Sequence, residues 1–260
     1  MKNALIYLLV FAAIQIGCAA LVRVLWPYIA GTPDITPMML IASSVASSVI
    51  AAVVFFLARW STLSRDYVRS RQWGVLFWSS VAAAGAIIPS AWLQEVLPEL
   101  PNWAEGQLDM ILRERWGYVA VGLLAPIVEE MVFRGAILRS LLSTMSRPWA
   151  AIAVSAVLFA AIHTNPAQLP HALLVGLLLG WMYMRTGSIV PGVAYHWVNN
   201  TVAYIMYNVM PDPDAPLSTL FGGDTLRTLM AVGCSLLILL PALFQPVSYT
   251  HLTLPTNSLV

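Results

Sequence analysis

Residues 117–141 read GYVAVGLLAPIVEEMVFRGAILRSL, an apolar run that nevertheless holds Glu129, Glu130 and Arg134 close together. The run is long enough to cross a bilayer, which takes about 20 mostly apolar residues. An ionisable group near the bilayer centre costs about 2.5–3.5 kcal/mol on insertion scales, so it normally faces a protein interior or a wet cavity. The run therefore predicts a membrane helix whose charged side chains serve a function.

The composition of the whole chain agrees with a membrane location. Of its 260 residues, 59% are hydrophobic and 10% are charged, whereas a typical soluble domain has about 25% charged residues. A net charge of +1 leaves no basic surface for a nucleic-acid partner. Cys18 and Cys234 lie inside apolar runs and are too few for a disulfide framework or a thiolate metal site. The sequence therefore predicts an integral membrane protein embedded in a lipid bilayer.

Apolar windows of spanning length recur and predict an all-α, polytopic membrane helical bundle with about eight transmembrane helices. Helices are expected because backbone polar groups in hydrocarbon must be satisfied within the segment. Residues 1–26 also resemble a signal peptide with a lipoprotein-like Cys18, but the apolar run is too long, which favours an uncleaved span. The eight windows cover residues 4–26, 38–58, 73–93, 117–141, 148–165, 169–185, 188–210 and 226–246.

Basic residues gather in alternate connections, which predicts that both termini are cytoplasmic. The long connection 94–116 mixes apolar and charged residues, and we leave open an amphipathic interfacial helix or a plain loop. Residues 247–260 form a polar tail that looks non-native, so they are excluded from the fold. On the predicted cytoplasmic side lie Lys2, Arg59, Arg65, Arg69, Arg71, Arg139, Arg147 and Arg185, and the exceptions are Arg113, Arg115 and Arg227.

Polar residues also interrupt the fifth and seventh predicted spans. His163 lies in the fifth, and His196 and Asn200, four apart and so on one helix face, lie in the seventh. The same rule pairs Glu130 with Arg134 as a structural ion pair and turns Glu129 to another face. At about 1.5 Å per residue, Glu129 and His163 lie at matching depth.

Each of these residues has a simpler explanation when taken alone. His163 could be an ordinary interior histidine, the Glu130 and Arg134 pair could only hold helices together, and Asn200 could only form an interhelical hydrogen bond. Four unrelated polar groups at matching depth are less probable than one site. We therefore predict a single intramembrane site among the fourth, fifth and seventh helices.

These residues resemble the motifs of the CAAX-protease and bacteriocin-processing family of intramembrane endopeptidases, also called the CPBP or Abi family. The motifs read Glu129-Glu130-x-x-x-Arg134, Phe159-x-x-x-His163 and His196-x-x-x-Asn200. The resemblance implies that Glu129 and His163 activate a water, and that His196 and Asn200 hold the oxyanion. The division that follows is N-terminal helices and loops (1–114), a catalytic core (115–210), a last transmembrane helix (211–246) and the tail (247–260).

The resemblance implies a protein or peptide substrate and a bacterial cytoplasmic membrane, but two questions stay open. Glu129, His163 and His196 are candidate zinc ligands, since two histidines and a carboxylate leave a position for water; a metal-free glutamate mechanism is the alternative. The sequence does not show whether the substrate carries a prenyl group. Two other functions are a non-catalytic peptide-binding or bacteriocin-immunity protein, and a transporter that uses Glu and His as a proton relay.

Overall fold

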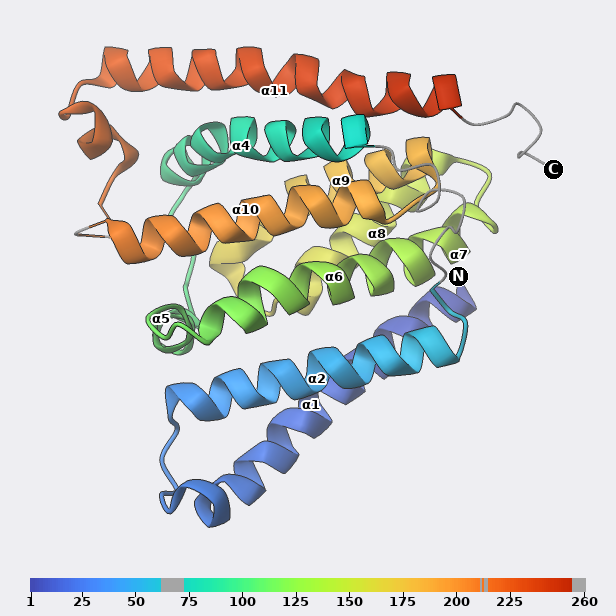
Figure 1. Cartoon of the computed structure of the whole chain (residues 1–260), viewed down its shortest axis with the longest axis vertical. Coiled ribbons are helices and arrows are strands. Elements are labelled where there is room, and N and C mark those ends of the chain that lie inside the picture. Colours follow the sequence, from blue (N-terminus) through green and yellow to red (C-terminus); the bar gives the residue numbers. More distant parts are fainter. Residues whose placement is uncertain (62–72, 211, 213–214, 254–260) are drawn as a thin grey trace.

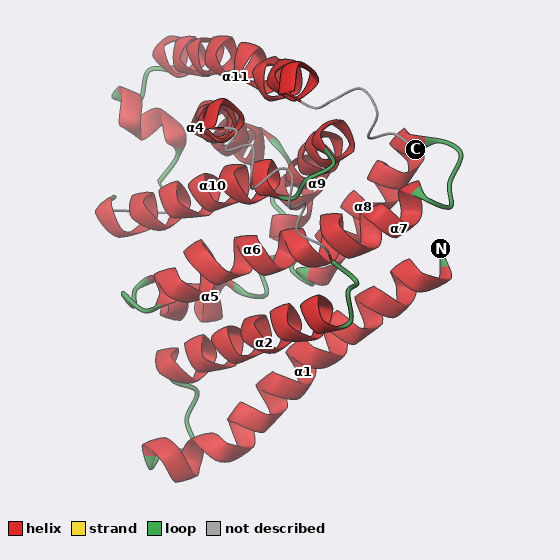
Figure 2. Ribbon diagram, turned by 45° about the vertical axis from the view of Figure 1, so that its right-hand side comes forward, coloured by secondary structure: helices red, strands yellow, loops and turns green. Residues whose placement is uncertain are grey.

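The computed structural model describes residues 1–61, 73–210, 212 and 215–253, and every regular element in these ranges is a helix, as predicted (Figure 2). Arg65, Arg69 and Arg71, used in the orientation argument, lie outside the described residues. The elements are α1 (Lys2–Ala30), α2 (Pro37–Leu57), α4 (Trp73–Val96), α5 (Glu105–Leu112), η1 (Tyr118–Leu124), α6 (Ala125–Glu129), η2 (Glu130–Leu138), α7 (Arg139–Leu142), α8 (Pro148–Ile162), η3 (Pro166–Gln168), α9 (Leu169–Thr186), α10 (Val190–Val209), η4 (Leu217–Phe221) and α11 (Thr225–Thr253).

The long helices lie side by side in a bundle, with the start of α1 and the end of α11 at the same end (Figure 1). Four neighbouring pairs dominate the packing: α4 with α11, α8 with α9, α1 with α2, and α4 with α10. α10 lies against α4 and reaches η1, α6 and α9. The prediction of a polytopic helical bundle is therefore confirmed.

Among the residues that the structure describes, five helical segments are long and apolar enough to cross a membrane. All eight windows predicted from the sequence are helical, but α8 is short, the fourth window is divided into four elements, and α10 carries polar residues along its length. The membrane-spanning segments found are Lys2–Ala30, Pro37–Leu57, Trp73–Val96, Pro166–Thr186 and Thr225–Gln245.

The fourth window forms one continuous helical rod in which two stretches, η1 and η2, have π-helical turns. Pro126, at the start of α6, lacks the backbone N–H that an α-helical turn would use. Such π turns occur frequently at functional sites because they shift the side chains that follow. All nine residues of η2 are buried, and α1, α2, α8 and α9 surround it. η2 is therefore the centre of the core.

The connection 97–117 contains the helix α5, preceded by a loop, and its proposed place at the membrane interface stays a prediction. α5 and the residues just after it are tied to α10 by three hydrogen bonds, in which Tyr207 donates to Asp109, Asn208 to the Leu112 carbonyl and Tyr204 to the Glu114 carbonyl. The bond from Tyr207, together with nearby Arg113, lowers the pKa of Asp109. At the other end of the chain, α11 continues to Thr253, past the window that ended at residue 246.

Two glycines let α9 approach α8 closely. A Cβ atom added to Gly176 would lie 2.9 Å from the Ala156 Cβ, and one added to Gly180 would lie 2.9 Å from the Ile152 Cγ2. These separations are shorter than a normal carbon contact, so any side chain at either position would push the two helices apart. The hairpin of α8 and α9 therefore depends on both glycines.

We expect Gly176→Ala to lower the free energy of unfolding by about 1–3 kcal/mol, because overpacking a close helix contact forces the backbone to shift. The matched control is Gly17→Ala in α1, where an added Cβ would meet nothing within 4 Å. Thermal unfolding of both variants in detergent micelles measures the difference. Equal midpoints for the two variants would contradict the packing described here.

Candidate active site

A cavity of about 460 Å³ lies between α5, α6, α8, α9 and α10, and all four predicted catalytic residues line it. Glu129 comes from the end of α6, His163 from the residue after α8, and His196 and Asn200 from α10. These residues are up to 71 positions apart in the sequence (200 − 129). The structure thus brings the three motifs to one place.

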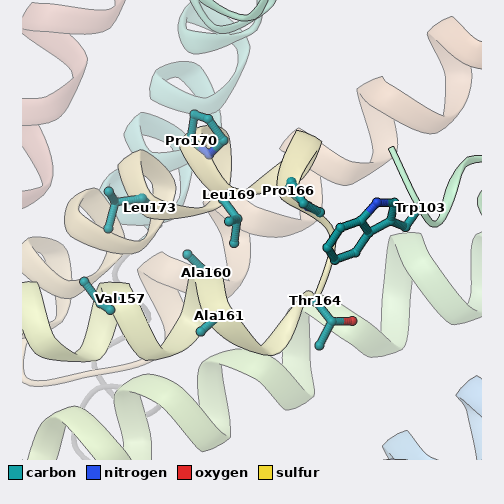
Figure 3. Close-up of a pocket in the computed structure, with 9 residues that line it drawn as sticks. All are labelled: Trp103, Val157, Ala160, Ala161, Thr164, Pro166, Leu169, Pro170 and Leu173. Atoms are coloured by element: carbon teal, nitrogen blue, oxygen red, sulfur yellow. The ribbon is translucent and has the colours of Figure 1, made fainter. Parts of the chain in front are cut away.

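A larger cavity, of about 680 Å³, lies on the other side of the α8–α9 turn and carries no comparable chemistry (Figure 3). Its lining is almost wholly apolar, with Trp103 at one end and Val157 and Leu173 toward the other. None of its lining residues is a carboxylate or an imidazole. Cavity size alone therefore does not select the cavity that the three motifs line.

The Glu130 and Arg134 side chains form a buried ion pair next to this site. Arg134 Nη1 donates to Glu130 Oε1 at 2.6 Å, and the two side chains are 1% and 0% exposed. Arg134 Nη2 donates to the Gly176 carbonyl at 3.2 Å, and the guanidinium carbon lies 4.5 Å from the centre of the Phe159 ring. One arginine therefore joins η2 to both α8 and α9.

His196 lies between the two carboxylates of the first motif. Its Nδ1 is 3.4 Å from Glu130 Oε1, and its Nε2 is 3.8 Å from Glu129 Oε2. Neither approach is a formed hydrogen bond, and His196 Nδ1 and Glu130 Oε2 are both buried without a hydrogen-bond partner among the described residues. The structure therefore adds a contact that the helix geometry alone does not give: Glu130 faces the catalytic-site histidine as well as Arg134.

α10 can approach Glu130 because residue 192 is a glycine. A Cβ atom at Gly192 would lie 2.6 Å from Glu130 Oε2. Any larger residue would displace either the carboxylate or the helix that carries His196 one turn further on.

His163 follows directly after α8 and is held at both its backbone and its ring. Its Nδ1 lies 2.8 Å from the Phe159 carbonyl, an acceptor, so Nδ1 carries the proton and Nε2 has the free lone pair. Phe159 also packs edge-on against the rings of His163 and His196. The second motif thus positions its histidine through both the carbonyl and the ring of its phenylalanine.

The turn after His163 is fixed by hydrogen bonds to the loop that leads to α5. Asn165 Nδ2 donates to Asn102 Oδ1 at 2.8 Å, and Asn165 Oδ1 accepts from the Trp103 backbone N–H at 3.0 Å. Thr164 has a φ of 51°, in the left-handed region that a β-branched residue rarely adopts. Its neighbours therefore hold the turn in a strained conformation next to the site.

Asn200 is oriented by two hydrogen bonds that leave it one donor to spare. Its Nδ2 donates to the Val121 carbonyl at 2.9 Å, and its Oδ1 accepts from Asn199 Nδ2 at 3.2 Å. An amide nitrogen carries two hydrogens. One N–H of Asn200 is therefore available to a ligand in the cavity.

Two polar residues of the cavity were not assigned to the site from the sequence, namely Gln168 and His171. Gln168 was treated as part of a connecting turn. His171 is an ionisable residue inside an apolar segment, the same signal that identified His163, so a stricter use of that signal would have found it.

The three zinc candidates do not form a recognisable metal site. Among the described residues, no group of three or more His, Cys, Asp or Glu side chains is arranged to hold a metal ion. A histidine bound to a metal normally donates its other ring N–H to a carbonyl or carboxylate, so the bond from His163 Nδ1 to the Phe159 carbonyl does not itself argue against a metal. The absence of such a group among the described residues is what argues that they do not fit a zinc ion in this arrangement.

Residues 112–202 match the family model described as Type II CAAX prenyl endopeptidase Rce1-like. The matched segment runs from the end of α5 into α10 and contains all three motifs. The resemblance seen in the motifs is therefore confirmed over this segment. No curated protein and no solved structure matches the chain.

We expect Arg134→Met to lower the free energy of unfolding by about 3–5 kcal/mol, because it leaves the Glu130 carboxylate buried and unpaired. The double variant Glu130→Gln with Arg134→Met removes that charge and should recover part of the loss. The control is Arg227→Met, which breaks an exposed pair with Asp224 and should change little. Urea or thermal unfolding in detergent checks all three, and a stable Arg134→Met protein would argue against the role of the pair.

Proposed function

We propose that this chain is an intramembrane endopeptidase that hydrolyses a peptide bond in a membrane-associated protein or peptide. The observation that carries the proposal is that Glu129, His163 and His196, from three separate helical segments, line one cavity. Catalysis needs a base near a site where a water and a carbonyl can meet. The family match over residues 112–202 supports the same reaction class.

Glu129 and His163 are the groups proposed to activate the water. Glu129 is 19% exposed, whereas its neighbour Glu130 is fully buried and paired, so Glu129 is the carboxylate open to the cavity. The free lone pair of His163 Nε2 accepts a hydrogen bond from the same water. Glu129 takes a proton as the water oxygen attacks the carbonyl carbon, and returns it to the leaving amine when the C–N bond breaks.

His196 and Asn200 are proposed to stabilise the oxyanion of the tetrahedral intermediate. They lie one helical turn apart on α10 and both line the cavity. The spare N–H of Asn200 is already oriented by its bonds to Val121 and Asn199. Donors fixed in advance need no reorganisation as charge develops, and removing one such donor typically costs about 2.7–4 kcal/mol of barrier.

Glu130 and Arg134 hold this arrangement in place. Glu130 faces His196 Nδ1 at 3.4 Å while Arg134 neutralises it at 2.6 Å. The pair thus sets the position of His196 without entering the reaction.

The proposal extends to location and to the organisation of the chain. The basic residues Lys2, Arg59, Arg139, Arg147 and Arg185 support cytoplasmic termini. The family resemblance is what supports a bacterial cytoplasmic membrane. Residues 115–210 would be the catalytic core, with 1–114 and 211–246 completing the bundle around it.

We expect Glu129→Gln to abolish peptide cleavage without altering folding, because the amide is nearly the same size and cannot accept the proton from water. Purified protein in detergent is assayed with a fluorescence-quenched peptide library, and unfolding midpoints are compared. The matched control is Glu105→Gln in exposed α5, which should cleave normally. Unchanged cleavage by Glu129→Gln would remove Glu129 from the role of base.

We expect cleavage to survive incubation with a strong chelator, because the candidate ligands do not form a metal-binding group. A zinc peptidase treated in parallel shows that chelation is complete. Loss of activity that zinc restores would replace the metal-free mechanism with one in which Glu129, His163 and His196 bind a metal.

A further inference from the structure

Gln168 and His171 are two polar residues of the cavity that the proposed reaction does not use. Gln168 ends η3 and His171 lies in the first turn of α9, three residues later. Residues three apart in a helical segment lie on the same face. Both side chains line the cavity together with Glu129 and His163.

Neither side chain forms a hydrogen bond with any part of the chain that the structure describes. Both residues are half-buried. The two other amide side chains of the cavity, Asn199 and Asn200, are both hydrogen-bonded within the protein. Both residues line the cavity without a partner among the described residues for their side-chain polar groups. Gln168 and His171 therefore offer unused hydrogen-bonding capacity to whatever enters the cavity.

His171 is also close to the reacting groups. It lines the same cavity as His163, from the proposed water-activating pair, and His196, from the proposed oxyanion pair. Beyond it on α9, Ala172 and Val175 continue the cavity wall with apolar surface. A molecule bound along α9 could thus form hydrogen bonds with Gln168 and His171 and apolar contacts beyond them.

We propose that Gln168 and His171 hydrogen-bond the main chain of an extended peptide substrate and position its scissile bond at Glu129 and His163. This inference rests on the proposed endopeptidase function. A peptide unit offers one donor and one acceptor, and both a carboxamide and a neutral imidazole can give and accept a hydrogen bond. Main-chain groups on one side of an extended chain recur about every 6.6–6.8 Å, and helical side chains three apart start about 5–6 Å apart. The spacing suits two such groups of one peptide.

The test compares Gln168→Leu and His171→Phe, which keep the approximate shape but remove the hydrogen-bonding groups. Each should lower kcat/KM about 2- to 10-fold, the range for a hydrogen bond of ordinary strength. The loss should appear in KM with kcat retained, as expected for binding shared by substrate and transition state. The matched control is Gln94→Leu, an exposed residue of α4 outside this cavity, which should behave as the unaltered protein.

A change in the substrate separates this role from an effect on folding. The best-cleaved library peptide is N-methylated at one backbone position at a time, which removes single N–H donors and leaves the protein untouched. At one or two positions methylation should raise KM about 2- to 10-fold for the unaltered protein, and have less effect on the variant that has lost the partner.

The outcomes distinguish the two proposals. If the unaltered protein cleaves no library peptide, the endopeptidase function fails. If it cleaves, and both variants retain normal KM or lose only kcat, the positioning role of Gln168 and His171 is overturned. If methylation acts equally on all proteins at every position, main-chain recognition by these two residues is likewise overturned.

Discussion

The buried ion pair of Glu130 and Arg134 is the constraint on which the rest of the core depends. Two charges removed from water must lie close to each other, because a buried charge without its partner is strongly destabilising. Because Glu130 and Arg134 are four residues apart, they form their ion pair within η2. Arg134 also donates to the Gly176 carbonyl and lies over the ring of Phe159. The close helix contacts at Gly176 and Gly192 follow from the same requirement, since α9 and α10 must come within reach of the pair.

The two neighbouring glutamates therefore have different surroundings although they differ by a single position. Glu130 points into the packed core, where it meets Arg134 and His196. Glu129 points into the cavity and keeps part of its surface accessible. A helix turns about 100° per residue, so adjacent side chains necessarily diverge. A fixed charge and an accessible one can thus be supplied by consecutive residues, which explains why the motif begins with a doublet.

Much of this arrangement could be predicted from the sequence, because in a membrane polar residues are rare and informative. The apolar windows predicted the helices. The polar residues within those windows predicted four of the residues that line the cavity, namely Glu129, His163, His196 and Asn200. The π turns of η1 and η2 leave no periodic signal, so the division of the fourth window was not foreseen. The contact between Glu130 and His196 depends on how α10 docks, and spacing within one helix carries no information about docking. His171 carries the same signal as His163, an ionisable residue within an apolar segment, and was not assigned because it lies outside the three motifs.

The hydrogen bonds between Asn165 and the residues Asn102 and Trp103 have a consequence for how the chain can vary over evolution. Surface connections usually tolerate insertions and deletions. Here the segment before α5 is bonded to a residue two positions after His163. A change in its length would move a proposed catalytic histidine that lies about 60 residues further along the chain (163 − 103). We therefore expect relatives to keep the length of this connection as closely as they keep the motifs themselves.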